Sequence, residues 1–181
     1  MTASKSCSAL QSGGYEVKRM IGKGDFVALV DEKSKMLYHV ARTILRSDED
    51  CKDALQESLL KAWENRHKLR DLSLFGTWVT RILINECHTL LRRKRKYLLK
   101  DEVEAAVSRA PDPALQWALE SLPEKLRLPL VLHYLEGYTY DQVSQMLHIP
   151  ESTVRSRLSR ARDALRMDME TEKEAWLHEA Q

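Results

Sequence analysis

The sequence contains little glycine and little proline, with six Gly and five Pro among its 181 residues. That scarcity, together with 43% hydrophobic and 31% charged residues, argues against collagen-like, disordered and all-β chains and favours a helical protein. No apolar run approaches the length of a membrane span. Residues 1–14 are rich in Ser and Gly and lack a long apolar core, so we expect a disordered N-terminus and no signal peptide. We therefore expect a cytoplasmic protein.

Cysteine and histidine are few and widely spaced. The three cysteines, Cys7, Cys51 and Cys87, form no C-x-x-C pair, which argues against a zinc site or a disulfide framework and favours reduced thiols. Catalysis requires acids at metal-ligand spacing or a nucleophile with its base, and the six histidines are scattered without an H-x-x-x-H pair. We expect no catalytic residue, no metal site, no cofactor and no small-molecule substrate.

Apolar residues recur at helical spacing through most of the chain, and no alternating strand pattern of any length occurs. One or two helices are predicted over residues 25–45, and further helices over 50–65 and 74–96. An acidic turn at 48–50 can cap the helix at 50–65. Pro111 and Pro113 then disfavour helix and mark a linker. The chain is predicted to be all-α, with two small helical domains joined by a flexible linker. The expected limits are a domain at 15–98, a linker at 99–112, a second domain at 113–167 and an acidic tail at 168–181.

The strongest local pattern lies in residues 139–166. Gly137 stands where a helix C-cap takes a left-handed residue, and Thr139 with Gln142 has the spacing of a capping box, so a short helix starts there. Pro150 ends that helix and tolerates the first turn of the next one. Two short helices joined by a tight turn match the helix-turn-helix, whose second helix lies in the major groove of DNA.

The second helix of this pair carries arginines on its exposed faces. The net charge of +2 does not by itself indicate nucleic acid, but the basic residues cluster here and at residues 92–96. Residues near the start of the helix can reach base edges, whereas the later arginines suit phosphates. The candidate DNA-binding residues are Glu151, Ser152, Thr153, Arg155, Ser156, Arg157 and Arg160. The alternative is a solvated arginine face on an ordinary helix pair.

In the first domain, the helix predicted at 50–65 has two distinct faces. Its apolar stripe consists of Cys51, Leu55, Leu59 and Ala62. Asp53, Gln56 and Glu57 project from another face, and such an acidic and amide patch suits a partner that carries arginines. The alternative is plain solvated surface.

The next predicted helix also has a second polar face. Trp78, Arg81, Asn85 and His88 recur at intervals of three, four and three and lead to the basic run at 92–96. Aromatic, amide and basic groups along one face favour single-stranded nucleic acid, through stacking, hydrogen bonds and phosphate neutralisation. The alternative is that Trp78 belongs to the core and that the basic run is only solvated.

These motifs resemble, in order, the conserved regions of bacterial sigma factors. Region 2.2 is similar to DALQESLLKAW at 53–63, and regions 2.3 and 2.4 are similar to FGTWVTRILIN at 75–85 and LLRRKR at 90–95. Region 4 is similar to LPEKLRLPLVLHYLEG at 122–137 with IPESTVRSRLSRAR at 149–162. The resemblance covers residues 24–167, and the short stretch between the halves points to the extracytoplasmic-function (ECF) group. Gly76 stands where the family commonly has a larger polar residue.

The resemblance implies a role for each patch. Asp53, Gln56 and Glu57 would bind the clamp helices of the polymerase β′ subunit, and the second domain would meet the β flap. The loop at 66–74 would hold a flipped base of the unwound −10 promoter element. The −10 set would be Trp78, Arg81, Asn85, His88, Arg92, Arg93, Lys94 and Arg95. The recognition helix would bind the duplex −35 element.

The family further implies a partner and a regulator. The chain would direct core RNA polymerase to stress-responsive promoters and would be controlled by an anti-sigma factor. It would associate with the nucleoid in the holoenzyme, or be held at the membrane by that anti-sigma factor.

Two other functions stay open at this point. A free-standing helix-turn-helix regulator would explain residues 139–166 but gives no role to the patches of the first domain. A nuclease would need a metal or nucleophile arrangement that the sequence does not suggest.

Overall fold

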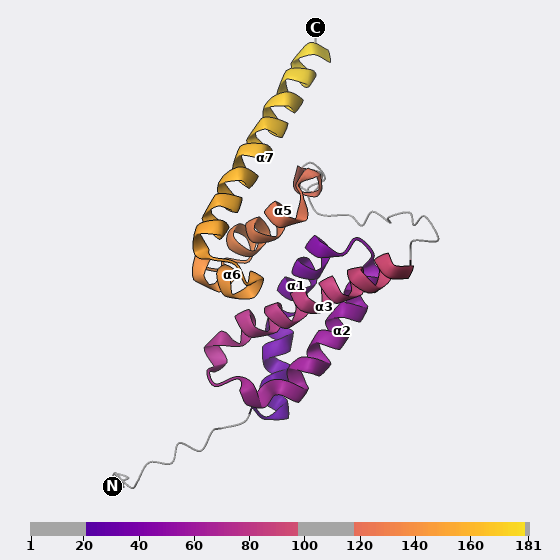
Figure 1. The fold of residues 1–181 in the computed structure, drawn as a ribbon, viewed down its shortest axis with the longest axis vertical. Coiled ribbons are helices and arrows are strands. Elements are labelled where there is room, and N and C mark those ends of the chain that lie inside the picture. The colour runs from indigo at the N-terminus through magenta and orange to yellow at the C-terminus, as the bar shows by residue number, and fades with distance from the viewer. Residues whose placement is uncertain (1–20, 98–117, 180–181) are drawn as a thin grey trace, which may run out of the picture.

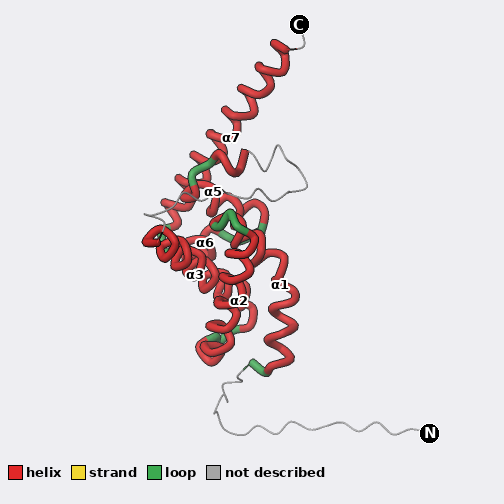
Figure 2. The backbone as a smooth tube through the Cα atoms, turned by 90° about the vertical axis from the view of Figure 1, so that its right-hand side faces the viewer, coloured by secondary structure: helices red, strands yellow, loops and turns green. Residues whose placement is uncertain are grey.

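The computed structural model describes the backbone of residues 21–97 and 118–179 and the side chains of residues 21–96 and 118–167. Every element in this part of the chain is helical, which confirms the predicted all-α class (Figure 2). The elements are α1 (Lys23–Ile44), α2 (Asp48–Asn65), the 3-10 turns η1 (Arg66–Lys68) and η2 (Leu72–Leu74), α3 (Phe75–Tyr97), α5 (Glu124–Leu130), the π-helical turn η3 (Val131–Leu135), α6 (Tyr140–Leu147) and α7 (Glu151–Glu179). The predictions for residues 1–14 and 99–112 lie outside the described residues.

Helices α1, α2 and α3 pack against one another and form the amino-terminal half (Figure 1). At one end of this bundle the ring of Phe26 meets Trp63 and Phe75 edge to face, with centroids 5.2 and 5.7 Å apart. The apolar stripe of α2 differs from its prediction, because Ala54 and Ser58 are fully buried while Leu55 and Leu59 are half-buried. Small residues at these positions let the neighbouring helix axes approach closely.

The start of α2 corrects one detail of the sequence prediction. Ser47, just before the acidic turn, is the N-cap residue, and its hydroxyl accepts a hydrogen bond from the backbone N–H of Asp50. The acids at 48–50 form the first helical turn, where their negative charge interacts favourably with the positive end of the helix dipole. Asp48 also accepts a hydrogen bond from the hydroxyl of Tyr38, which joins α2 to α1.

In the carboxy-terminal half, α5 widens into a π-helical turn directly after a proline. Pro129 has no N–H to donate, so the regular ladder is interrupted there. The chain then makes a wider turn, in which the N–H of Glu136 bonds to the carbonyl of Val131, five residues back. Gly137 ends the turn with a positive φ of 73°, as its sequence position predicts. This reversal leads the chain to Tyr138, which faces the amino-terminal half.

Helices α6 and α7 form the predicted helix-turn-helix. The capping box is present, since Thr139 accepts a bond from the N–H of Gln142, and the side chain of Gln142 accepts one from the N–H of Thr139. His148, with a φ of 53°, ends α6. The buried face of α7 is the predicted one, with Val154, Leu158 and Ala161 buried and Leu165 half-buried. The backbone of α7 remains helical to Glu179, beyond the predicted domain limit at 167.

The two halves are not separate in space. Helix α6 packs on α3, and α5 and η3 pack on α1 (Figure 1). The buried apolar side chains of both halves belong to one continuous cluster. None of the helices in the described part combines the length and the hydropathy that a bilayer crossing requires.

Candidate functional site

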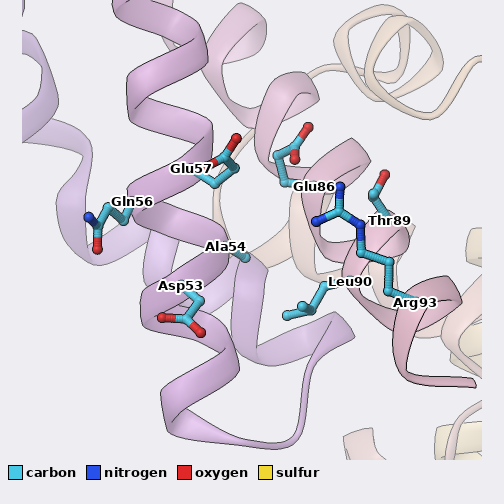
Figure 3. A pocket seen from close by; sticks show the side chains of 8 residues that line it. All are labelled: Asp53, Ala54, Gln56, Glu57, Glu86, Thr89, Leu90 and Arg93. Carbon is cyan, nitrogen blue, oxygen red and sulfur yellow. The ribbon is translucent and has the colours of Figure 1, made fainter. Parts of the chain in front are cut away.

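The acidic patch of α2 lies on the surface of the bundle. Asp53, Gln56 and Glu57 are all exposed, because the positions of α2 that face the bundle are taken by small buried residues. Between α2 and α3 lies an open hollow of about 280 Å³, which Figure 3 shows from close by. It is lined by Asp53, Ala54, Gln56, Glu57, Glu86, Thr89, Leu90 and Arg93. The structure therefore brings the predicted patch together with four residues of α3.

One lysine links the two walls of this hollow. The Nζ atom of Lys61 lies 2.6 Å from Oε2 of Glu86 on α3 and 3.4 Å from Oε1 of Glu57 on α2. The hydrogen bond to Glu86 is the main reason that the pKa of Lys61 is raised. Lys61 and Glu86 were not found by sequence reasoning, because 25 residues separate them and only the packing of α2 on α3 makes them neighbours.

The polar face of α3 begins at the edge of the core. Trp78 is half-buried, with its ring centroid 6.1 Å from that of Phe75, so it both packs against the core and remains partly accessible. Arg81 and Asn85 are exposed one turn apart, as their spacing predicts. This face can therefore offer a ring edge, an amide and a guanidinium in one row.

The basic end of α3 is exposed from Arg92 to Lys96. Arg92 donates a hydrogen bond of 3.0 Å to the hydroxyl of Thr89, within the same helix. The Nζ atom of Lys94 lies 2.6 Å from Oδ1 of Asp50 at the start of α2. Arg93 lines the hollow and Arg95 is exposed, so the basic run divides between the hollow, an ion pair and open solvent.

His88 occupies a different environment from the rest of this face. Its Nε2 atom lies 2.8 Å from Oε1 of Glu124, the first residue of α5. This hydrogen bond is the main cause that lowers the pKa of Glu124. The carboxy-terminal half thus already contacts one of the side chains predicted to meet DNA.

The loop at 66–74 is built from two short 3-10 turns. The guanidinium carbon of Arg66 lies 3.9 Å from the ring centroid of Trp63, an arrangement that favours a cation–π contact. Asp71 accepts a 2.8 Å bond from the backbone N–H of Ser73, and hydrogen bonding from Ser73 lowers the pKa of Asp71. Beyond this turn Leu72 is about half exposed. The loop thus combines an ordered backbone with accessible apolar surface.

The start of α7 faces outward from the helix-turn-helix. Ser152, Arg155, Ser156 and Arg160 are exposed; Glu151, Thr153 and Arg157 are half-buried. Arg155 lies 3.1 Å from Glu151 one turn earlier, and its guanidinium lies over the ring of Tyr140, 5.1 Å from the ring centroid. All seven predicted residues therefore fall on the first three turns of one helix, where a groove of DNA could reach them together.

No cluster of three or more His, Cys, Asp or Glu side chains suited to a metal ion occurs among the residues that the structure describes. Cys51 and Cys87 are free and fully buried. Desolvation raises the pKa of the Cys87 thiol to about 12.

Comparison with known families identifies both halves of the chain. The family model for Sigma-70 region 2 matches residues 29–97, and the family model for Sigma-70, region 4 matches residues 114–165. The chain is 32% identical over 152 residues to the ECF RNA polymerase sigma factor SigM of Mycobacterium tuberculosis, covering 77% of this chain and 74% of that protein. It is 27% identical over 175 residues to the ECF RNA polymerase sigma factor SigW of Bacillus subtilis, covering 83% and 94%.

Solved structures share the fold. The sigma factor RpoE of Bartonella quintana, in complex with the anti-sigma factor NepR, aligns with a TM-score of 0.73 at 22% identity, over 81% of this chain and 97% of that chain. CnrH, in complex with the cytosolic domain of CnrY, aligns with a TM-score of 0.62 at 21% identity, over 83% and 90%. At these identities the likeness concerns the arrangement of helices.

Proposed function

The chain belongs to the ECF group of the sigma-70 family of RNA polymerase sigma factors, and from this premise we propose how its surfaces divide the work of promoter recognition. Residues 15–98 form the unit that binds core polymerase and the −10 element, and residues 113–167 form the unit that binds the −35 element. Residues 99–112 link the two, and residues 168–181 form an acidic tail. The single observation that carries this division is that three polar surfaces lie on three different helices, α2, α3 and α7.

The hollow between α2 and α3 is the proposed site for the β′ clamp helices. Asp53, Gln56 and Glu57 contribute acceptors on one wall, and Glu86 and Arg93 contribute charges of both signs on the other. An amphipathic helix that carries arginines would find bidentate acceptors in the carboxylates, which is the strong form of charged hydrogen bond. The hollow supports this assignment because a rigid, concave, charged surface can hold a helical partner in one orientation.

The exposed face of α3 is the proposed reader of the unwound −10 strand. Trp78 offers a ring for stacking, Asn85 an amide for base edges, and Arg81 a charge for the backbone. His88 joins this set once it is released from Glu124. The basic residues Arg92, Arg93, Lys94 and Arg95 extend the positive surface along the same strand. The loop at 66–74 is the proposed pocket for a flipped base.

The first turns of α7 are the proposed reader of the duplex −35 element. Glu151, Ser152, Thr153, Arg155 and Ser156 can meet base edges, because a recognition helix presents its N-terminal residues to the groove. Arg157 and Arg160 follow on the same helix and suit the phosphates, which raise affinity without reading sequence. Binding at this surface should weaken steeply with salt as counterions are released.

We also propose the setting in which the chain acts. It is an initiation factor rather than an enzyme, and it needs no cofactor for this role. Its partners are core polymerase, through the β′ clamp and the β flap, promoter DNA and an anti-sigma factor. It therefore works in the cytoplasm, at the nucleoid when in the holoenzyme, or at the membrane when an anti-sigma factor there retains it.

The test is holoenzyme formation followed by run-off transcription with core polymerase on a genomic library. We expect a discrete set of start sites that share −10 and −35 elements and that appear only when the chain is added. A free-standing regulator would instead bind duplex promoter DNA without polymerase, and a nuclease would cleave DNA in the presence of a divalent metal. Either result, in the absence of holoenzyme, would overturn the proposal.

A further inference from the structure

Arg155, one of the residues proposed to read the −35 element, has partners on both helices of the helix-turn-helix, α6 and α7 (Figure 1). Its Nη2 atom lies 3.1 Å from Oε2 of Glu151, one turn earlier on α7. Its guanidinium carbon lies over the ring of Tyr140, the first residue of α6, at 5.1 Å from the ring centroid. The arginine side chain is still 65% exposed, so these contacts restrict it and leave it accessible to DNA.

Tyr140 is the fixed member of this group. Its ring lies against that of His133 on η3, with centroids 4.5 Å apart and planes inclined by 33°. Nδ1 of His133 lies 2.7 Å from the backbone carbonyl oxygen of Tyr138, a hydrogen bond that orients the imidazole. Tyr140 is itself half-buried and packs against the hydrophobic core. The tyrosine ring is therefore held by the fold, independently of Arg155.

Glu151 is the second partner of Arg155 and the first residue of α7. A glutamate one turn before a basic residue is the favourable order for an ion pair on a helix, and a negative charge in the first turn suits the helix dipole. The side chain of Glu151 is 43% exposed, so solvent screens the pair and keeps it weak. Glu151 thus offsets part of the charge of Arg155 at the point where α7 begins.

The contact with Tyr140 favours hydrogen bonds at the edge of the guanidinium. This group is planar, and its N–H donors point outward in that plane. A ring over the face leaves the edge donors for a base such as guanine, which accepts two of them through O6 and N7. An arginine without such support loses rotamer freedom when it takes up this pose. Tyr140 reduces that loss because it orients the side chain before DNA binds.

The contact with Glu151 acts against phosphates. A phosphate attracts any exposed cation, and it carries no sequence information. When Arg155 turns to a phosphate, the carboxylate of Glu151 loses a donor and lies near a second negative charge. A base edge carries no net charge, so this repulsion is weaker there. Glu151 therefore disfavours non-specific contacts of Arg155 more than specific ones, and such a repulsive element is a general source of specificity.

We propose that Tyr140 is a positioning residue for −35 recognition, which acts by holding the guanidinium of Arg155, and that Glu151 adds specificity by disfavouring phosphate contacts. This inference rests on the proposed assignment of α7 to the −35 element. Tyr140 lies on the first helix of the helix-turn-helix and outside the set of DNA-binding residues predicted from the sequence. Reading by Arg155 therefore depends on both helices of the motif.

The test uses holoenzyme assembled from core polymerase and the full-length chain. A promoter found by run-off transcription is compared with a duplex of the same length in which only the −35 element is scrambled. The ratio of the two dissociation constants measures −35 discrimination. The slope of log affinity against log salt measures the number of phosphate contacts. Both quantities are determined for each variant.

Variants of Tyr140 test the positioning role. Tyr140→Leu removes the ring and should lower the discrimination ratio roughly two- to fivefold, the strength of an exposed cation–π contact expressed as a ratio. Its salt slope should stay at the parental value, because no charge is removed. Tyr140→Phe retains the ring and should retain the ratio. Tyr134→Leu is the matched control and should also retain it, since Tyr134 contacts His133, with centroids 4.8 Å apart, but is exposed on η3.

Glu151→Gln tests the second part of the proposal, because it keeps the shape of the side chain and removes its charge. Affinity for the scrambled duplex should rise roughly twofold, the strength of an ion pair one turn apart. The salt slope should steepen by up to about one, and the discrimination ratio should fall. Asp163→Asn removes an exposed acid from the same helix and should leave the ratio unchanged. An unchanged ratio for Glu151→Gln would refute its proposed role.

A double variant shows whether Tyr140 acts through Arg155. In an Arg155→Ala background, Tyr140→Leu should have no further effect on the ratio, because the side chain that it holds is absent. An equal loss in both backgrounds would refute the positioning role. Circular dichroism checks that each variant retains its helices. If Tyr140→Leu loses helix content, the comparison of Glu151→Gln with Asp163→Asn still decides the role of Glu151, and Tyr140→His, which keeps an aromatic ring of weaker cation–π strength, replaces Tyr140→Leu in the cycle.

Failure of this inference and failure of the proposed function give different results. If Arg155→Ala keeps the full discrimination ratio, the assignment of α7 to the −35 element is wrong and the inference falls with it. If Arg155→Ala lowers the ratio while Tyr140→Leu and Glu151→Gln do not, the proposed function stands and the inference is wrong.

Discussion

The two surfaces proposed to bind DNA differ in how far the rest of the chain already occupies them. On α7, Arg155 contacts Glu151 and Tyr140, both within the helix-turn-helix itself. On α3, His88 bonds to the opposite half and Lys94 pairs with α2. The α7 surface therefore forms from contacts within the helix-turn-helix alone. On the α3 surface, two of the side chains proposed to bind DNA already have partners elsewhere in the chain.

This difference follows from where each helix lies in the chain fold. α7 packs one apolar stripe on α5 and α6 and leaves its remaining faces open. α3 is central, because α1, α2 and α6 all pack on it. Because three helices cover most of its surface, α3 leaves few exposed side chains for binding a partner. The surface proposed for duplex DNA thus lies on a peripheral helix, while the surface proposed for single-stranded DNA shares a helix with the core.

The largest expected effect is on stability, from truncating a core side chain beneath α7. Leu158 is 2% exposed and lies on the stripe that holds α7 in place. Leu158→Ala leaves a cavity, so we expect the free energy of unfolding to fall by about 2–5 kcal/mol. Urea denaturation measures it. Leu135→Ala, at a position that is 56% exposed, is the control and should change stability by less than about 0.5 kcal/mol. Equal effects of the two variants would contradict this account of the core.

A pair of contact variants should separate the two surfaces. Arg155→Ala should weaken −35 recognition by about 1–3 kcal/mol and leave the −10 preference unchanged. Asn85→Ala should do the reverse, altering the −10 preference while polymerase binding persists. Run-off transcription on a promoter library measures both. Arg46→Ala removes an exposed arginine just after α1 and serves as the charge control. If Arg155→Ala leaves the promoter profile unchanged, the assignment of α7 is wrong.

The sequence predicted the helices and the helix-turn-helix because their signals are local. The capping box of Thr139 and Gln142, the left-handed Gly137 and the buried stripe of α7 each depend on residues within a few turns, and the structure confirms all three. Class and order of elements follow from the same short-range periodicity. The predicted cap of α2 at residues 48–50 was wrong, because Ser47 is the N-cap. Serine and the acids after it all favour a helix start.

What the sequence could not predict is contact across long separations. Lys61 meets Glu86 across 25 residues, and Tyr138 meets Thr80 across 58. Nothing in the spacing of these residues marks them as neighbours, since helix packing decides it. Gly76 departs from the family pattern, but the contact at this position is made by Tyr138 from the other half of the chain. The sequence therefore predicts the residues of each candidate surface. It does not predict which of those residues contact other parts of the chain.

A smaller effect should distinguish the two helix starts. Thr139→Ala removes a reciprocal capping box, so we expect the free energy of unfolding to fall by about 1 kcal/mol. Ser47→Ala removes one bond of 3.4 Å and should cost less, about 0.5 kcal/mol. Chemical denaturation of both variants compares them directly. A larger loss for Ser47→Ala would mean that the acidic first turn of α2 relies on its serine more than the geometry indicates.

The smallest expected effect concerns the hollow between α2 and α3. Lys61 lies among the carboxylates of Glu57 and Glu86 and offsets part of their negative charge. Lys61→Met keeps most of the apolar side chain and removes its charge. Stability should fall by no more than about 1 kcal/mol, because Lys61 is 40% exposed although its partner Glu86 is only 14% exposed. Because the hollow then becomes more acidic, its attraction for an arginine-bearing helix should increase.

We therefore expect Lys61→Met to strengthen holoenzyme formation a few-fold at low salt, with the gain disappearing as salt screens the charges. Lys35→Met, which removes an exposed lysine of α1 outside the hollow, should show neither change. Titration of labelled chain with core polymerase at two salt concentrations measures both. Weaker binding at low salt would indicate that Lys61 itself contacts polymerase, and the hollow would then be a mixed-charge site rather than an acidic one. Because Lys61→Met touches neither α7 nor the exposed face of α3, promoter choice should be identical to that of the parent chain.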